Sequence, residues 1–260
     1  MRSRLWAAAA LSLSATVAWK SSPEAAPRHY RVDLKTTQVV DLTAVGEKEQ
    51  RQVFGSVGFL SVAVQDTTGG KTITIVLDSL QSDSASPIPT EAAKSARGTT
   101  WHGIVGANGR ISGFNASSEN PVAGQMTGLL REFLPPVQAG TAAGRTWTDT
   151  TETSLDVPNG SMAIRTVTNF QSSAENFAGV KAVKIASASS SSYSGTQQTE
   201  GGNAAIEGTG TGSSTWYIGP DGTYLGGTRS SVQTLMVSGA FAPQPLPVTV
   251  TTEAATSLLK

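Results

Sequence analysis

The chain has 260 residues, with 19 basic and 19 acidic side chains, 27 glycines, no cysteine and 15% charged residues. Nucleic-acid-binding proteins need a basic face to displace phosphate counterions, and this sequence has no cluster of Lys and Arg. The lack of cysteine excludes disulfides, thiolate metal sites and a cysteine nucleophile. Its 31 serines and 32 threonines favour exposed strand faces and turns over long helices.

The first 18 residues are typical of a secretory signal peptide. Arg2 and Arg4 precede an apolar run of 14 residues that ends at Ala18, which is too short to span a bilayer of about 30 Å. Small residues at the end of the run favour cleavage after Ala18. No cysteine follows, so a thioether lipid anchor is excluded. We therefore predict an exported protein, periplasmic or secreted, with no membrane span after cleavage and a flexible segment over residues 19–28.

Most of residues 29–260 are predicted to form one β-rich domain. Apolar and polar residues alternate from Tyr30 to Lys35, and residues 51–81 are typical of a long hairpin with a bulge near Gly58 or burial on both faces. Asn108-Gly109 is a strong hairpin turn signal. The serine-rich run over residues 187–194 is assigned to a strand end or loop tip, and Val248 and Val250 to a short last strand. About eleven strands result, antiparallel because their connections are short.

Helical spacing is clearest in one segment. Asn120-Pro121 predicts an N-cap, and the apolar residues that follow recur at helical spacing until Pro135-Pro136, which gives one long helix over residues 121–134. A shorter helix is expected from Thr90 to Ala96, and residues 253–259 add a helical turn or fray. The predicted fold is mainly β: a large curled antiparallel sheet or open half-barrel, with the long helix packed against its concave face.

Motifs for catalysis or metal binding are missing from the sequence. Gly55-Ser56-Val57-Gly58 has Phe54 where a nucleophile elbow needs glycine. The only histidines, His29 and His102, have no carboxylate at a ligand spacing. The glycines of residues 208–212 lack the spacing of a dinucleotide loop. We therefore expect no enzyme, no metal and no cofactor.

A resemblance to a family rests on Leu134-Pro135-Pro136 followed by Gly144-Arg145-Thr146-Trp147, with strands on both sides and an exported leader. This pattern resembles a group of uncharacterised bacterial exported proteins whose architecture is similar to the open β-barrel of LolA- and LppX-type lipid or lipoprotein carriers. The short motif covers about 14 residues, and the match in strand count and helix placement covers residues 29–252. The chain departs from those carriers by opening with a strand and by lacking the lipoprotein cysteine.

Three interpretations stay open. The first is an exported carrier that holds an apolar or amphipathic, lipid-like ligand between the sheet and the long helix. The second is a non-enzymatic envelope protein that binds a protein partner through its sheet. The third, an integral outer-membrane barrel, is disfavoured by the low aromatic content. The residues predicted to line the ligand site are Val122, Met126, Leu129, Leu130, Phe133, Trp101, Trp147 and Trp216.

Overall fold

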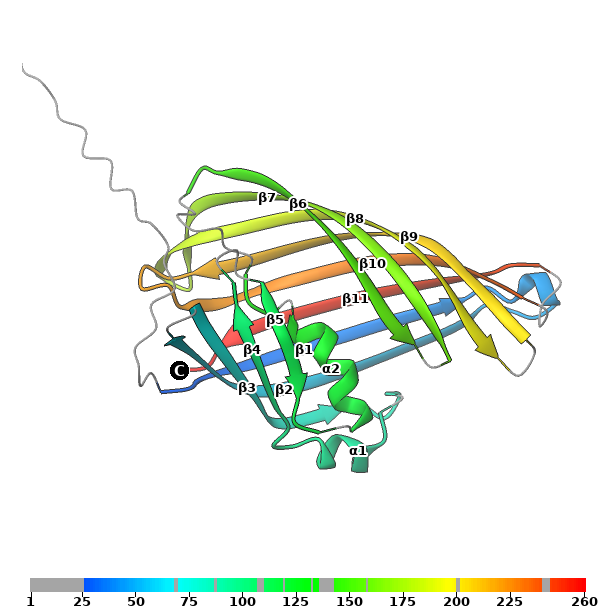
Figure 1. Ribbon diagram of the computed structural model, residues 1–260, viewed down its shortest axis with the longest axis horizontal. Coiled ribbons are helices and arrows are strands. Elements are labelled where there is room, and N and C mark those ends of the chain that lie inside the picture. The colour runs from blue at the N-terminus through cyan, green and yellow to red at the C-terminus, as the bar shows by residue number, and fades with distance from the viewer. Residues whose placement is uncertain are drawn as a thin grey trace, which may run out of the picture.

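The computed structural model describes residues 26–67, 70–86, 88–106, 110–118, 120–131, 133–135, 143–157, 159–199, 202–239 and 244–260. The leader and most of the segment predicted to be flexible therefore lie outside the described residues. Eleven antiparallel strands form one sheet in the order β5-β4-β3-β2-β1-β11-β10-β9-β8-β7-β6 (Figure 1). The strands are β1 Arg28–Val40, β2 Gln50–Thr67, β3 Gly70–Ser82, β4 Thr100–Val105, β5 Ile111–Ala116, β6 Thr146–Val157, β7 Gly160–Phe177, β8 Val180–Thr199, β9 Gly202–Ile218, β10 Tyr224–Gly239 and β11 Leu246–Leu258.

The sheet is curled and open. β5 and β6 are its two edges, and an ion pair between Arg110, next to β5, and Asp149 of β6 brings those edges together at one place. Direct cross-strand partners point to the same face, so the register assigns every strand residue to a concave or a convex side. Over residues 187–197 of β8 and 228–237 of β10 the concave residues are half-buried and their neighbours are exposed, as curvature requires.

Two short helices complete the described fold, α1 Thr90–Ser95 and α2 Pro121–Arg131, with a 3-10 turn over Thr43–Val45. The Asn120 side chain accepts a hydrogen bond from the Val122 N–H at 2.8 Å, which is the N-cap that the sequence predicts. α2 covers the concave face at the end of the sheet formed by β1 to β5. The core there includes Tyr30, Val32, Leu60, Ile73, Ile75, Leu77, Trp101, Phe114, Val122, Leu130 and Phe133.

The prediction of one long helix over residues 121–134 is wrong, because α2 ends at Arg131. Proline disfavours helical backbone in the residue before it, so Pro135 prevents a helical Leu134. The chain instead makes a tight turn in which the Phe133 N–H donates to the Leu130 carbonyl at 3.1 Å. Phe133 and Leu134 are still buried, so their helical spacing reflects core contacts made by a turn.

Two strand boundaries also differ from the prediction. Residues 253–259 are not a helical turn, since β11 runs from Leu246 to Leu258 and pairs with both β1 and β10. The serine-rich run is not a loop tip but the middle of β8, paired on both sides. Alanine, serine and threonine have weak local preferences, and sheet pairing decides their conformation. The predicted irregularity near Gly58 is confirmed as a register shift between Phe59 and Leu60.

Two buried tyrosines make the stability of the folded protein depend on pH in the alkaline range. The Tyr30 hydroxyl donates to the Tyr224 carbonyl at 2.9 Å, and Phe133 packs edge-on against both rings. Burial raises the pKa of Tyr30 from 10.0 to about 12, and burial also raises the pKa of Tyr224. The folded state therefore retains the phenol protons to a higher pH than the unfolded state does.

This stabilisation is complete below pH 10.0 and is expected to be lost as the pH rises through about 12. The loss per tyrosine is at most about 1.4 kcal/mol per pH unit. Urea denaturation across this range measures it, and Tyr30→Phe should show a shallower decline than the wild type. Equal alkaline declines in the two proteins would contradict the assignment to Tyr30.

Candidate functional site

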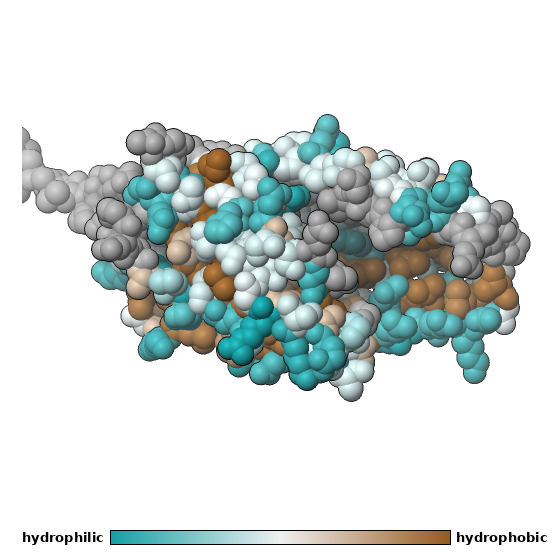
Figure 2. Space-filling model, turned by 60° about the horizontal axis from the view of Figure 1, so that its bottom comes forward, coloured by the Kyte–Doolittle hydropathy of each residue, from teal (hydrophilic) through white to brown (hydrophobic). Residues whose placement is uncertain are grey.

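Much of the concave face lies beyond α2, and register defines it as a set of cross-strand rows. Each row joins the inward-facing residues of neighbouring strands. The Thr36 row contains Phe54, Thr36, Thr252, Ser231, Gly212, Ser189, Thr168 and Asp149. Successive rows pass through Gln38, Val40 and Val237. We call the inward-facing surface of these four rows the trough. Figure 2 shows a hollow with hydrophobic residues in it at the end of the molecule beyond α2.

Polarity changes along the trough. The Thr36 row, nearest α2, is rich in hydroxyl groups, and the Gln38 row is also largely polar. The two rows farthest from α2 are mainly apolar, and their apolar members are half-buried. Their apolar members are Val40, Val248, Leu235, Tyr193, Ile164, Val237, Leu246, Ile206 and Met162.

Glycines form part of the trough floor. Gly208, Gly210 and Gly212 of β9 all lie in concave-side rows, so this part of the strand has no side chains on that face. The Tyr193 ring lies over this strip, because a Cβ added at Gly210 would meet the Tyr193 Cε2 and hydroxyl at 3.1 Å. The missing side chains therefore make room for the Tyr193 ring against the floor of the trough.

The space beneath α2 is nearly full. A cavity of about 40 Å³ lies between the helix and the sheet, far below the roughly 300 Å³ typical of small-molecule sites. Five of the eight predicted site residues line it: Met126, Leu129, Leu130, Phe133 and Trp216. Val122 and Trp101 are packed deeper in the core, at 2% and 0% exposure. The structure thus brings most of the predicted residues together, but around a packed core.

Trp147 lies in a separate cluster. Its ring stacks on Phe170 with centroids 5.0 Å apart, and Phe170 is 6.5 Å from Trp216. Both Trp147 and Phe170 belong to the row of Leu34, next to the trough. Trp216 thus connects this small aromatic cluster to the core beneath α2. Trp147 anchors the edge strand β6 to β7.

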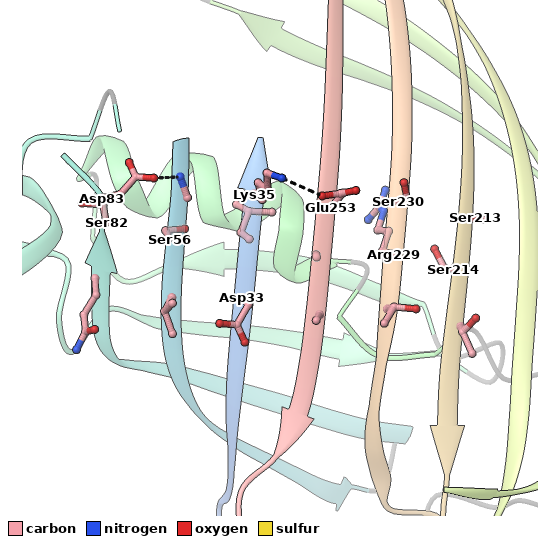
Figure 3. A pocket seen from close by; sticks show the side chains of 18 residues that line it. Asp33, Lys35, Ser56, Ser82, Asp83, Ser213, Ser214, Arg229, Ser230 and Glu253 are labelled. Atoms are coloured by element: carbon pink, nitrogen blue, oxygen red, sulfur yellow. Dashed lines mark hydrogen bonds and ion pairs between the residues drawn. The ribbon is translucent and has the colours of Figure 1, made fainter. Parts of the chain in front are cut away.

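A larger depression of about 770 Å³ is lined by residues of β1, β2, β3, β9, β10 and β11. The charged residues that line it are Asp33, Lys35, Asp83, Arg229 and Glu253. Asp33, Lys35 and Glu253 alternate in register with inward-facing Leu34 and Ala254, so these three lie on the convex face. Figure 3 shows these side chains with α2 behind the strands. Lys35 and Glu253 pair at 3.8 Å, and the exposed, mixed charges of this depression suit water better than an apolar ligand.

A serine, a histidine and an aspartate meet on the convex face. The Ser61 Oγ lies 3.0 Å from the His29 Nδ1 and 2.7 Å from the Asp78 Oδ2. A catalytic triad places the histidine between the other two so that it can accept the serine proton. Here the single hydroxyl proton is donated to Asp78, and His29 can only donate to Ser61. This arrangement orders the strand ends and does not activate a nucleophile.

Neither a metal cluster nor a membrane helix is present in the part of the chain that the structure describes. Within those residues, no three His, Asp or Glu side chains gather in a way that could hold a metal ion. The described helices are also too short and too polar to cross a bilayer.

Comparison with known proteins gives no relative that identifies the chain. No family model and no curated protein matches it. Among solved structures, two mutants of the Rhodopseudomonas blastica porin each align with 90% of this chain and 100% of their own, at 9% identity and a TM-score of 0.27. Pseudomonas aeruginosa OccK11 aligns with 90% of this chain and 96% of its own, at 8% identity and a TM-score of 0.20. TM-scores this low do not indicate a shared fold.

Proposed function

We propose that the protein is an exported, non-enzymatic carrier or binding protein for an amphipathic, lipid-like ligand. The observation that carries this proposal is the trough: a concave sheet surface, beyond the covering helix, whose far rows are apolar and only half-buried. A contiguous apolar surface that stays in contact with solvent is a feature of ligand-binding grooves and interaction sites. The signal peptide predicted for residues 1–18 supports a place in the envelope or outside the cell.

The sequence suggested a ligand between the sheet and the helix. Because the space beneath α2 is nearly full, we place the proposed ligand beyond the helix instead. A chain of methylenes needs a continuous apolar surface, and the cavity of about 40 Å³ does not provide one. The rows of Val40 and Val237 do, and each methylene removed from water there contributes about 0.8 kcal/mol. The residues beneath α2 then form an end wall to the trough, while the ligand lies on β1 and β7 to β11.

Native mass spectrometry of the exported protein, purified without detergent from a bacterial envelope, tests the proposal. We expect a stoichiometric adduct that organic solvent extracts, and that returns when the extract is added back to the stripped protein. The stripped protein is the control, because it shows whether the adduct is held in the native fold. A wild-type protein that carries no adduct and takes up none of the envelope lipids offered to it would contradict the proposal.

A second candidate function is supported by the edge strand β6. In the described sheet this strand of 12 residues pairs only with β7, so its other edge carries backbone groups that could receive a strand from a protein partner. Asp149 and Glu152 lie along it, and charges of this kind limit unspecific pairing. Crosslinking in cells followed by identification of a partner attached to residues 146–157 would favour this envelope interaction function over the carrier.

A further inference from the structure

Charge is distributed very unevenly between the two faces of the sheet. In the row of Leu34 and the four rows of the trough, two described charged residues point inward, Arg229 of β10 and Asp149 of β6. Asp149 lies on the edge strand and pairs with Arg110. Arg229 lies in the middle of the sheet, directly opposite Ala254 and Ser214. The convex side of the same strands carries Asp33, Lys35 and Glu253, among others.

Arg229 is placed where the trough meets the helix. It lines the small cavity beneath α2 together with Met126 and Leu129, it also belongs to the lining of the larger depression, and it is half-buried. Its direct cross-strand neighbours, Ala254 and Ser214, are uncharged. Arg229 also takes part in an interaction within the chain. A guanidinium has five N–H donors, so it can keep such a partner and bind an anion as well.

Hydroxyl groups surround Arg229 on the trough side. Ser214 is its row partner, and Ser231 and Thr252 are in the next row. The apolar rows begin at Leu235, six residues along the same strand, which is about 20 Å at the rise of a β-strand. A positive, hydroxyl-lined end and an apolar end therefore lie on one surface, so a chain whose head contacts Arg229 crosses the polar rows of Thr36 and Gln38 before it reaches the apolar rows.

We propose that the ligand is an anionic amphiphile, whose carboxylate or phosphate head binds the Arg229 guanidinium and whose chain extends along the trough towards Leu235. This inference rests on the proposed carrier function and adds the chemistry of the head group. Charge-assisted hydrogen bonds from a guanidinium to such an anion are among the stronger polar contacts in proteins. The half-buried position of Arg229 limits their screening by salt.

Calorimetric titration of the stripped, full-length mature protein with dodecanoate and with dodecanol tests the head-group assignment. The two probes share a chain and differ in charge. The wild type is expected to prefer dodecanoate by about tenfold, because a charge-assisted hydrogen bond contributes that order of affinity. Arg229→Gln should lose this preference and keep its dodecanol affinity, and Arg229→Lys should retain most of it. Arg165→Gln is the matched control, since Arg165 is exposed on the convex face and pairs with Glu152.

Each result has a distinct meaning. A wild type that binds dodecanol as tightly as dodecanoate would overturn the head-group assignment without touching the carrier function, whether or not Arg229→Gln folds. Unchanged selectivity in a folded Arg229→Gln variant would overturn it as well. A wild type that binds neither probe, and no envelope lipid, would instead contradict the carrier function itself.

Discussion

Trp101→Ala is expected to lower the free energy of unfolding by about 3–5 kcal/mol, the largest effect of any single substitution considered for this protein. Trp101 has 0% exposure and lies on β4 between its cross-strand partners Ile75 and Ala116. Its indole N–H donates to the Thr127 Oγ1 at 2.9 Å, so one side chain joins β4 to α2. Alanine removes both the packing and this link, and it leaves a cavity under the helix that the short α2 cannot close.

Urea denaturation of the wild type and the variant measures this loss. Ile104→Ala is the matched control, because Ile104 lies on the same strand but faces outward at 53% exposure, and it should cost less than about 1 kcal/mol. Trp101→Phe is expected to fall between the two, since it keeps much of the packing and loses the hydrogen bond. Similar losses for Trp101→Ala and Ile104→Ala would show that the space beneath α2 is not the central core.

Leu235→Asp is expected to reduce dodecanoate affinity by at least about tenfold. Leu235 is half-buried in the row of Val40, directly opposite Val248, at the apolar end of the trough. A carboxylate there would have to lose water on contact with an acyl chain, and the contact with several methylenes would be lost. The side chain lies about six residues from Arg229, so the head-group contact itself should be unaffected.

Met236→Asp provides a control at the next residue of the same strand. Met236 points to the convex face and is 39% exposed, so the same charge is added there without entering the trough. We expect this variant to bind dodecanoate as the wild type does. Circular dichroism and urea denaturation establish that both variants are folded. Equal loss of binding in the two variants, or none in either, would show that the ligand does not lie on the concave face.

Much of the architecture could be predicted from the sequence because local signals specify it. Alternation of apolar and polar residues marks the strand that contains Tyr30, and Asn120-Pro121 marks the start of α2. The end of that helix could not be read from spacing, because Phe133 and Leu134 are buried by a turn. The middle of β8 could not be predicted from local sequence either, since its serines adopt an extended backbone through pairing with β7 and β9.

The candidate site was harder to predict than the fold. Helical spacing indicated Met126, Leu129 and Leu130 as ligand-lining residues. They do lie together, but they mainly fill the core between α2 and the sheet. The trough depends on which alternate residues of eight separate strands face inward, and this is set by long-range register and by the curl of the sheet. One local signal was present, the run of glycines over residues 208–212, which marks a strand face that accommodates the ring of Tyr193.

The position of the bound chain is the most direct test of the central claim, that the trough holds the ligand. A fatty acid with a photoreactive diazirine near the end of its chain can be bound to the protein, irradiated and mapped by mass spectrometry of peptides. We expect labelling at inward-facing residues of the far rows, such as Leu235, Val248 and Tyr193, with dodecanoate competing for it. Labelling confined to the convex depression around Lys35 and Glu253 would contradict the claim.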